Sequence, residues 1–203
     1  MINIKQTMCI GCLCEGFMFA DMFGIRTTGP VDNIHGYNFK STLDVFNGKL
    51  FDAILSDKID KTEENEAPAW YDDDNLFRYY LINNESHWNW RTVHNNFGKT
   101  ERKEEFKKRI NAFNNFNANL GKSSFYIYAI SDGDNELSKE DFNYTIENLP
   151  DYVLDKLIIV SGVRFKIPKI FYKNFRCIHY NYDVGVDEND KVFKSWNKIL
   201  YAE

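Results

Sequence analysis

The pattern of apolar and polar residues along the chain predicts an α/β protein. Two segments, "SFYIYAIS" and "KLIIVSG", are apolar on both of the faces that a strand would present. Strands of this kind are typical of a parallel sheet that is covered by helices on both sides. Residues 2–10 predict a first strand, and "FRCIHYNY" predicts a last one.

Helical periodicity occupies the stretches between these strands. Residues 100–120 have one apolar side, and Gly121 ends the pattern. A shorter helix is predicted at 14–23, with Gly24 as its stop. Further helices are predicted within 39–56, at 138–149 and at 188–201.

Two alternating segments, "LFRYYLIN" and "HWNWRTVH", predict a β-hairpin. From residue 124 the predicted order is strand, helix, strand and strand, and the chain begins with a strand followed by a helix. We therefore expect one α/β domain over residues 1–203, with a mostly parallel central sheet flanked by helices. Residues 57–75 are acidic, contain a proline and lack apolar periodicity, so we expect a surface loop or insertion there.

Charge and hydropathy exclude several classes of partner. The net charge is −5 and no basic stripe stands out, which argues against nucleic-acid binding. No segment approaches the ~20 apolar residues that span a bilayer, so we expect no membrane association. The opening "MINIKQTM" does not resemble a signal peptide, so we expect a cytoplasmic protein with reduced cysteines. The sequence leaves the oligomeric state open.

Candidate chemistry follows the predicted strands at their carboxyl ends, where ligands bind in open α/β sheets. Cys12 and Cys14 follow the first strand, His94 follows the hairpin, and Asp132 follows "SFYIYAI". A thiol, an imidazole and a carboxylate are the groups of a Cys–His–acid nucleophilic site. In such a site the thiolate attacks a carbonyl, the imidazole carries a proton, and the acid orients the imidazole.

Cys14 is the preferred nucleophile because it stands at the start of the helix predicted at 14–23. The amino end of a helix stabilises an anion and lowers the pKa of a thiol. The alternative is that Cys14 only packs at a joint between a strand and a helix, as buried cysteines often do. Cys9 lies inside the predicted strand, and packing is its expected role.

Two other cysteine chemistries fit the spacing less well. Zinc would have to combine Cys9, Cys12 or Cys14 with Cys177 and His179, but "CIH" lacks the spacing of a usual second ligand pair. A redox pair Cys9-x-x-Cys12 would have to open a helix, whereas Cys9 lies within a strand. The sequence therefore predicts neither a metal nor a cofactor.

His94 is the candidate base and Asp32 the first candidate for its orienting acid, with Asp132 second. By strand alternation Trp90 and His94 share one face, and a half-buried histidine with a single partner is the alternative interpretation. Asp32 lies in the loop "TTGPVDNIHG", where an aspartate most often caps a turn. It could instead reach His94.

The segment "IGCLCEGFMFADMFGIRTTGPVDN" resembles the opening of a bacterial family of unknown function described as papain-like cysteine peptidases. Its pattern has a strand ending in glycine, two residues, a cysteine that opens a helix, a short basic turn and a "PFDW" loop. Gly11, Cys14, Arg26 and Asp32 match that pattern, and Arg109 fits a later helix rich in arginine and phenylalanine. The resemblance implies Cys–His chemistry and a papain-like α+β fold.

The chain departs from the family pattern at four positions. Phe17 stands where the family has a small residue, Val31 and Asn33 stand for the Phe and Trp of "PFDW", and Asn95 stands for the Asp of a later His-Asp pair that His94 would match. Two hypotheses follow. The first is a cysteine-dependent hydrolase, peptidase or acyl transferase that acts on a small-molecule, peptide or acyl substrate. The second, which the departures favour, is a non-catalytic α/β binding or accessory protein descended from such an enzyme.

Overall fold

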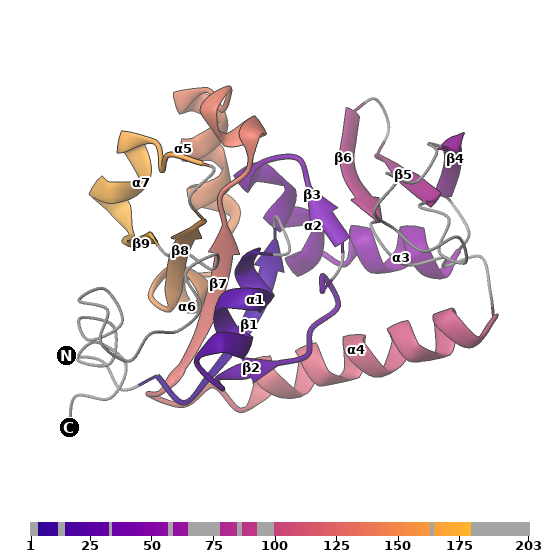
Figure 1. The fold of residues 1–203 in the computed structure, drawn as a ribbon, viewed down its shortest axis with the longest axis horizontal. Helices are drawn as coiled ribbons and strands as arrows, with labels where there is room; N and C mark the ends of the chain where they lie inside the picture. Colours follow the sequence, from indigo (N-terminus) through magenta and orange to yellow (C-terminus); the bar gives the residue numbers. More distant parts are fainter. Residues whose placement is uncertain are drawn as a thin grey trace.

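Two β-sheets and the helices around them make up the computed structural model of this protein (Figure 1). The structure describes residues 4–11, 15–32, 34–56, 59–64, 78–84, 87–92, 100–162 and 165–179. Within them, the larger sheet has five strands, in the order β2 (Arg26–Thr27), β1 (Gln6–Gly11), β7 (Ser124–Ala129), β8 (Leu157–Ser161) and β9 (Arg176–His179).

Every neighbouring pair in this five-stranded sheet is parallel. All residues of β7 and β8 are buried, as their apolar sequences predict. The structure thus confirms an α/β fold with a mostly parallel sheet and flanking helices, rather than the α+β arrangement that the family resemblance implies.

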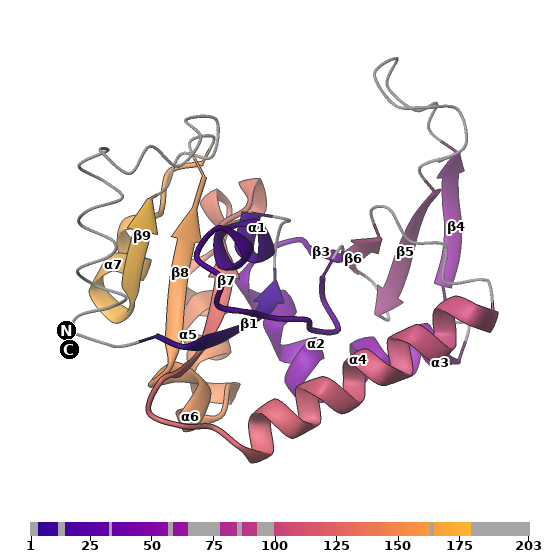
Figure 2. The same ribbon diagram turned by 60° about the horizontal axis from the view of Figure 1, so that its bottom comes forward.

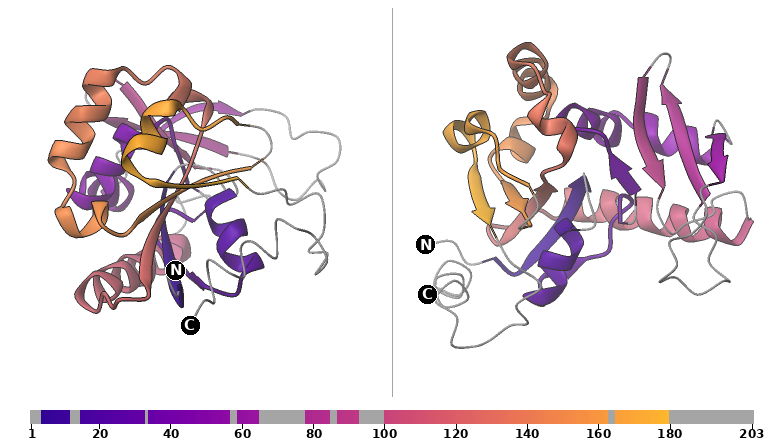
Figure 3. Two further views of the ribbon diagram at one scale, coloured as in Figure 1. Left: turned by 90° about the vertical axis from the view of Figure 1, so that its left-hand side faces the viewer. Right: turned by 45° about the horizontal axis from the view of Figure 1, so that its top comes forward.

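Helix α1 (Glu15–Met22) covers one face of the parallel sheet, where it contacts β1, β7 and β8 (Figure 3, left). Its second residue is Gly16, and a Cβ there would lie 3.1 Å from Cys9 Sγ and 3.4 Å from a methyl of Ile127. The glycine therefore lets the start of the helix approach the sheet closely. Cys9 is 5% exposed beneath it, which fits the packing role expected for this cysteine.

The opposite face of the sheet carries an aromatic core and most of the remaining helices. These are η1 (Phe39–Ser41), α2 (Thr42–Phe46), α5 (Lys139–Asn148), α6 (Asp151–Leu154) and α7 (Lys169–Asn174). The ring of Phe39 has its centroid 5.1 Å from that of Tyr128 in β7, 5.7 Å from Phe142 in α5 and 5.3 Å from Phe171 in α7. All four rings are fully buried.

The smaller sheet is antiparallel and lies to one side of the parallel sheet (Figure 3, right). Its order is β3 (Ile34–Gly36), β6 (His87–Thr92), β5 (Arg78–Asn84) and β4 (Ile59–Glu64). The β5–β6 pair confirms the predicted hairpin. Strand β4 lies in the acidic segment 57–75, where the sequence predicts a loop or insertion; residues 65–75 lie outside the described part of the chain. Backbone pairing with β5 supports this strand without an apolar pattern.

Helix α4 (Thr100–Ala118) links the two sheets (Figure 2). Its Phe113 packs on Phe51 of α3 (Lys49–Leu55), which in turn contacts β5. Nearer its carboxyl end, Phe116 packs on Tyr126 of β7. The apolar side that predicted this helix therefore contacts both halves of the molecule.

Sequence and structure differ most at the short elements. Helix α7 separates β8 from β9, whereas the sequence predicts two strands in succession. Its start is marked by Pro168, a residue that suits the first turn of a helix. The helix predicted at 188–201 and the end of "FRCIHYNY" lie outside the described residues. Among the described helices, none has the length and apolar character needed to cross a membrane.

A glycine substitution tests the contact between the turn after β7 and the turn before η1. A Cβ at Gly133 would lie 2.3 Å from the backbone oxygen of Tyr37, so Gly133→Ala forces backbone to move. We expect a loss of about 3 kcal/mol in the free energy of unfolding, measured by urea denaturation. Gly121→Ala is the matched control, because its nearest neighbour would be at 3.7 Å. Equal effects of the two substitutions would contradict this account.

Candidate active site

The carboxyl end of β1 is the point from which the candidate site is built. Gly11 ends the strand with φ +139°, and a Cβ on it would lie 3.5 Å from Tyr128 and 3.7 Å from the indole of Trp90. Helix α1 begins at Glu15. Cys12 and the predicted nucleophile Cys14 lie between these two points, outside the described residues.

Trp90 brings the antiparallel sheet against this end of β1. Its side chain is 2% exposed, and its Nε1–H donates to Asp44 Oδ2 at 3.0 Å. Gly36 leaves room for the ring, because a Cβ there would lie 3.3 Å from it. The predicted base, His94, follows Trp90 by four positions in the sequence and lies outside the described residues.

The loop that carries Asp32 packs on β1 from the other side. It continues from β2, which pairs with β1 through Thr7–Arg26 and Met8–Thr27. A Cβ at Gly29 would lie 3.1 Å from Met8 Cγ and 3.4 Å from the backbone oxygen of Cys9. The loop then turns through Asp32 towards β3.

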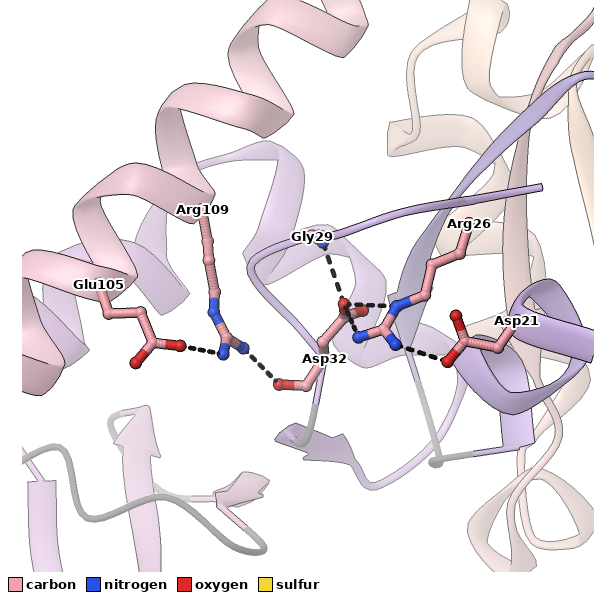
Figure 4. A network of polar contacts seen from close by, with 6 residues as sticks. All are labelled: Asp21, Arg26, Gly29, Asp32, Glu105 and Arg109. Carbon is pink, nitrogen blue, oxygen red and sulfur yellow. Dashed lines mark hydrogen bonds and ion pairs between the residues drawn. The ribbon is translucent and has the colours of Figure 1, made fainter. Parts of the chain in front are cut away.

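Asp32 is held by Arg26 and by its own turn (Figure 4). Arg26 donates from Nη2 to Asp32 Oδ2 at 2.9 Å and from Nε to the same oxygen at 3.3 Å. The backbone N–H of Gly29 donates to that oxygen at 3.2 Å, as expected for an aspartate that closes a turn. The other guanidinium nitrogen of Arg26 donates to Asp21 of α1 at 2.6 Å.

A second arginine ties this loop to α4. Arg109 Nη1 donates to the backbone oxygen of Asp32 at 3.0 Å, while its Nη2 bonds Glu105 one turn earlier on the same helix (Figure 4). Asp32 is therefore held between two arginines, one beside β1 and one from the helix that joins the sheets. Both of these arginines belong to the residues on which the family resemblance rests.

The carboxylate of Asp32 is buried, and its two oxygens have different surroundings. Its side chain has no exposed surface, and burial raises its pKa, although the hydrogen bonds from Arg26 and Gly29 and the charge of Arg109 oppose that rise. Oδ2 accepts all three hydrogen bonds, two from the Arg26 guanidinium and one from the backbone N–H of Gly29. Oδ1 is buried and has no hydrogen-bond partner among the described residues.

Asp132, the second candidate acid, is exposed at the start of η2 (Asp132–Asn135). Beyond β7 the buried carboxylate is instead that of Asp134, which is 2% exposed. It accepts hydrogen bonds from the backbone N–H of Phe39 and of Ser131, both at 2.8 Å, and from the hydroxyl of Tyr128. The sequence analysis did not single out Asp134, although the Ser-x-x-Asp spacing of Ser131 and Asp134 is a known signal for a capped turn.

The cysteines and histidines among the described residues all lie on strands of the two sheets. Cys9 and Cys177 lie on β1 and β9, which are three strand spacings apart, or about 14 Å. These two cysteines therefore cannot bind one zinc ion, although the sequence placed them in one possible ligand set. Burial raises the pKa of Cys177 to about 11. His179 Nε2 lies 2.7 Å from the hydroxyl of Tyr172, and His35 is half-buried in β3.

No family model, curated protein or solved structure matches the chain. The resemblance to papain-like cysteine peptidases therefore stays a prediction from the quoted residues.

The buried carboxylate of Asp134 predicts a dependence of stability on pH. Burial raises its pKa from 3.8 to about 6 in the folded protein, against the hydrogen bonds from Ser131, Tyr128 and Phe39. The folded protein therefore binds the carboxyl proton more tightly than the unfolded chain does. This contribution to stability is complete at pH values below 3.8, the pKa in the unfolded chain, and is lost as the pH rises through about 6. The loss amounts to about 3 kcal/mol for two pKa units.

Asp134→Asn removes this titration. We therefore expect the difference in unfolding free energy between the parent protein and this variant to fall by up to about 3 kcal/mol from pH 3.5 to pH 7.5. Urea denaturation across that range measures it. Asp132→Asn is the control, since Asp132 is exposed and should give a nearly constant difference. Parallel stability curves for the parent protein and Asp134→Asn would contradict the assignment.

Proposed function

We propose that this protein is a cysteine-dependent hydrolase or acyl transferase of the cytoplasm. In this proposal Cys14 is the nucleophile, His94 is the general base, and Asp32 orients His94. The substrate is a peptide, a small amide or an acyl compound. The observation that carries the proposal is the position of Asp32 relative to the end of the β3–β6 ladder.

The register of that ladder relates Asp32 to His94. Ile34 of β3 pairs with Thr92 of β6, and the strands are antiparallel. A step towards the amino terminus from Ile34 therefore corresponds to a step towards the carboxyl terminus from Thr92. Asp32 is two residues before Ile34 and His94 is two residues after Thr92, so both are close in sequence to this end of the ladder. The placement of His94 itself lies outside the described residues.

Oδ1 of Asp32, which has no hydrogen-bond partner among the described residues, supports the same role. A buried carboxylate oxygen without a proton donor is costly, so such an oxygen is expected to serve a group that the site needs. The ring N–H of a histidine is a suitable donor, and the resulting pair would select the tautomer whose other nitrogen accepts the thiol proton. The exposed Asp132 offers no comparable site.

The surroundings of Cys14 in the sequence suit a nucleophile. It directly precedes Glu15, with which α1 begins, and the amino end of a helix favours a thiolate over a thiol. The N–H groups of a first helical turn have no partner within the helix and can stabilise an oxyanion. Gly16 in that turn seats the helix on the sheet, which would keep these groups in place.

The proposed reaction has two stages. His94 first takes the thiol proton of Cys14. The Cys14 sulfur then bonds to the substrate carbonyl carbon, the bond to the leaving group breaks, and the His94 imidazolium gives that proton to the leaving group. In the second stage His94 takes a proton from water or from an acceptor, whose oxygen or nitrogen displaces the sulfur. Asp32 stays ionised throughout and stabilises the imidazolium.

One departure from the family pattern has a structural reading. Val31 is 4% exposed and lies in the hydrophobic core, so the family's Phe at this position would be a packing residue rather than a reacting group. Its replacement therefore leaves the proposed chemistry intact. Loss of reactivity in the test below would favour the binding or accessory protein instead.

The reactivity of Cys14 towards an alkylating agent tests the proposal without a known substrate. Near pH 6 we expect iodoacetamide to modify Cys14 faster than Cys9, Cys12 or Cys177, because helix and imidazolium both lower its pKa. Mass spectrometry after partial alkylation gives the ranking. His94→Ala should abolish the advantage of Cys14, and Asp32→Ala should reduce it less.

Two further measurements make this result decisive. Alkylation in urea should bring the four cysteines to similar rates, because it removes the folded surroundings. His179→Ala is the matched histidine control and should leave the rate at Cys14 unchanged, since His179 lies on β9 beside Tyr172. If Cys14 reacts no faster than the other cysteines, and is indifferent to His94→Ala, the proposal is wrong.

A further inference from the structure

The side chain of Asp32 poses an electrostatic problem that the proposed function depends on. Its carboxylate is wholly buried, and burial disfavours the charged form of an acid. A protonated Asp32 would carry no charge to stabilise an imidazolium. Some group must therefore hold Asp32 in its ionised state if it is to act as the orienting acid.

The described residues place two cations close to Asp32. Arg26 donates two hydrogen bonds to Oδ2, whereas Arg109 contacts only the backbone oxygen of Asp32. Each arginine is itself shared with a more exposed carboxylate, Asp21 on α1 for Arg26 and Glu105 on α4 for Arg109. Of the two arginines only Arg26 bonds the side chain of Asp32, whose Oδ2 also accepts a hydrogen bond from the backbone N–H of Gly29.

Helix α1 holds Arg26 in this geometry by two contacts. Asp21, near the carboxyl end of α1, binds Nη1 at 2.6 Å. Phe17 of the same helix lies beneath the guanidinium, whose carbon is 4.8 Å from the centre of the ring, a distance that gives a cation–π contact. Phe17 is one of the departures from the family pattern, and here its ring packs against the guanidinium of Arg26.

From this geometry we infer that Arg26 is a positioning residue for the proposed reaction, which keeps Asp32 ionised and occupies Oδ2 so that Oδ1 remains to accept a proton donor. The inference rests on the proposed function for its role in catalysis. Its electrostatic part concerns only Arg26 and Asp32, and can be measured separately. Because α1 follows Cys14 directly, the helix proposed to activate the thiol also holds the arginine.

The first experiment measures the ionisation of Asp32 directly. The ¹³C signal of its carboxyl group is followed by NMR as a function of pH in the full-length protein, and Asp32→Asn identifies the signal by its loss. In the parent protein we expect the signal of the ionised carboxylate at pH 6, where alkylation of Cys14 is measured. Arg26→Gln should raise the midpoint by about 2 pH units, because it removes an opposite charge at hydrogen-bond distance.

Two variants control this measurement. Arg26→Lys keeps the charge and should keep the midpoint within about one pH unit of the parent value. Arg176→Gln removes an exposed arginine on β9 and should leave it unchanged. If Arg26→Gln does not fold, the ionisation state of Asp32 at pH 6 in the parent protein still decides. A protonated Asp32 at pH 6 in the parent protein, or the same midpoint after Arg26→Gln, would overturn the inference.

The second experiment connects Arg26 to Cys14. The pH profile of alkylation at Cys14 should move to higher pH in Arg26→Gln, by as much as in Asp32→Asn. The double variant should show no further shift, because Asp32→Asn removes the carboxylate charge directly and Arg26→Gln removes it by letting Asp32 take up a proton. Additive shifts would contradict a role exerted through Asp32. If Cys14 shows no selective reactivity even in the parent protein, the proposed function fails, while the carboxyl titration still decides the electrostatic role of Arg26.

Discussion

The burial of the Asp32 carboxylate is the constraint on which the arrangement around the candidate site depends. A buried carboxylate that loses its partner costs several kcal/mol. Its ion pair with Arg26 therefore holds β2 and the following turn together, and Asp21 extends the same network to α1. The backbone oxygen of Asp32 also accepts a hydrogen bond from Arg109 of α4, the helix that joins the two sheets. Movement of any of these elements would expose or unpair a charge.

A second buried carboxylate organises the neighbouring part of the sheet's carboxyl edge. Asp134 binds the backbone at the end of β7 and at the start of η1, as well as the hydroxyl of Tyr128. Its partners are neutral donors, whereas Asp32 has an arginine. The physical consequence is electrostatic: with neutral donors burial raises the pKa of Asp134 to about 6, whereas the charge of Arg26 opposes the effect of burial on Asp32.

The parallel sheet and the long helix could be predicted because apolar periodicity is a local property. The apolar runs of β7 and β8, the one-sided pattern of α4 and the glycine after α1 each leave their signal within a few residues. Short elements such as α7 and β4 leave no such signal, because neighbours that are distant in the sequence stabilise them. The buried role of Asp134 was missed for the same reason, since burial depends on Phe39 and Tyr128 rather than on adjacent residues.

For the candidate site, the sequence by itself determined which kinds of group are present: a thiol at a strand–helix junction, an imidazole after a hairpin, and aspartates in two loops. Only the tertiary structure decided that Asp32 is buried and paired with Arg26, whereas Asp132 is exposed. It also separated Cys9 from Cys177 by the order of the strands. The physical reason is that the charge state and partners of a side chain depend on solvent exposure and on contacts across long stretches of sequence, such as that between Arg109 and Asp32, which no local pattern records.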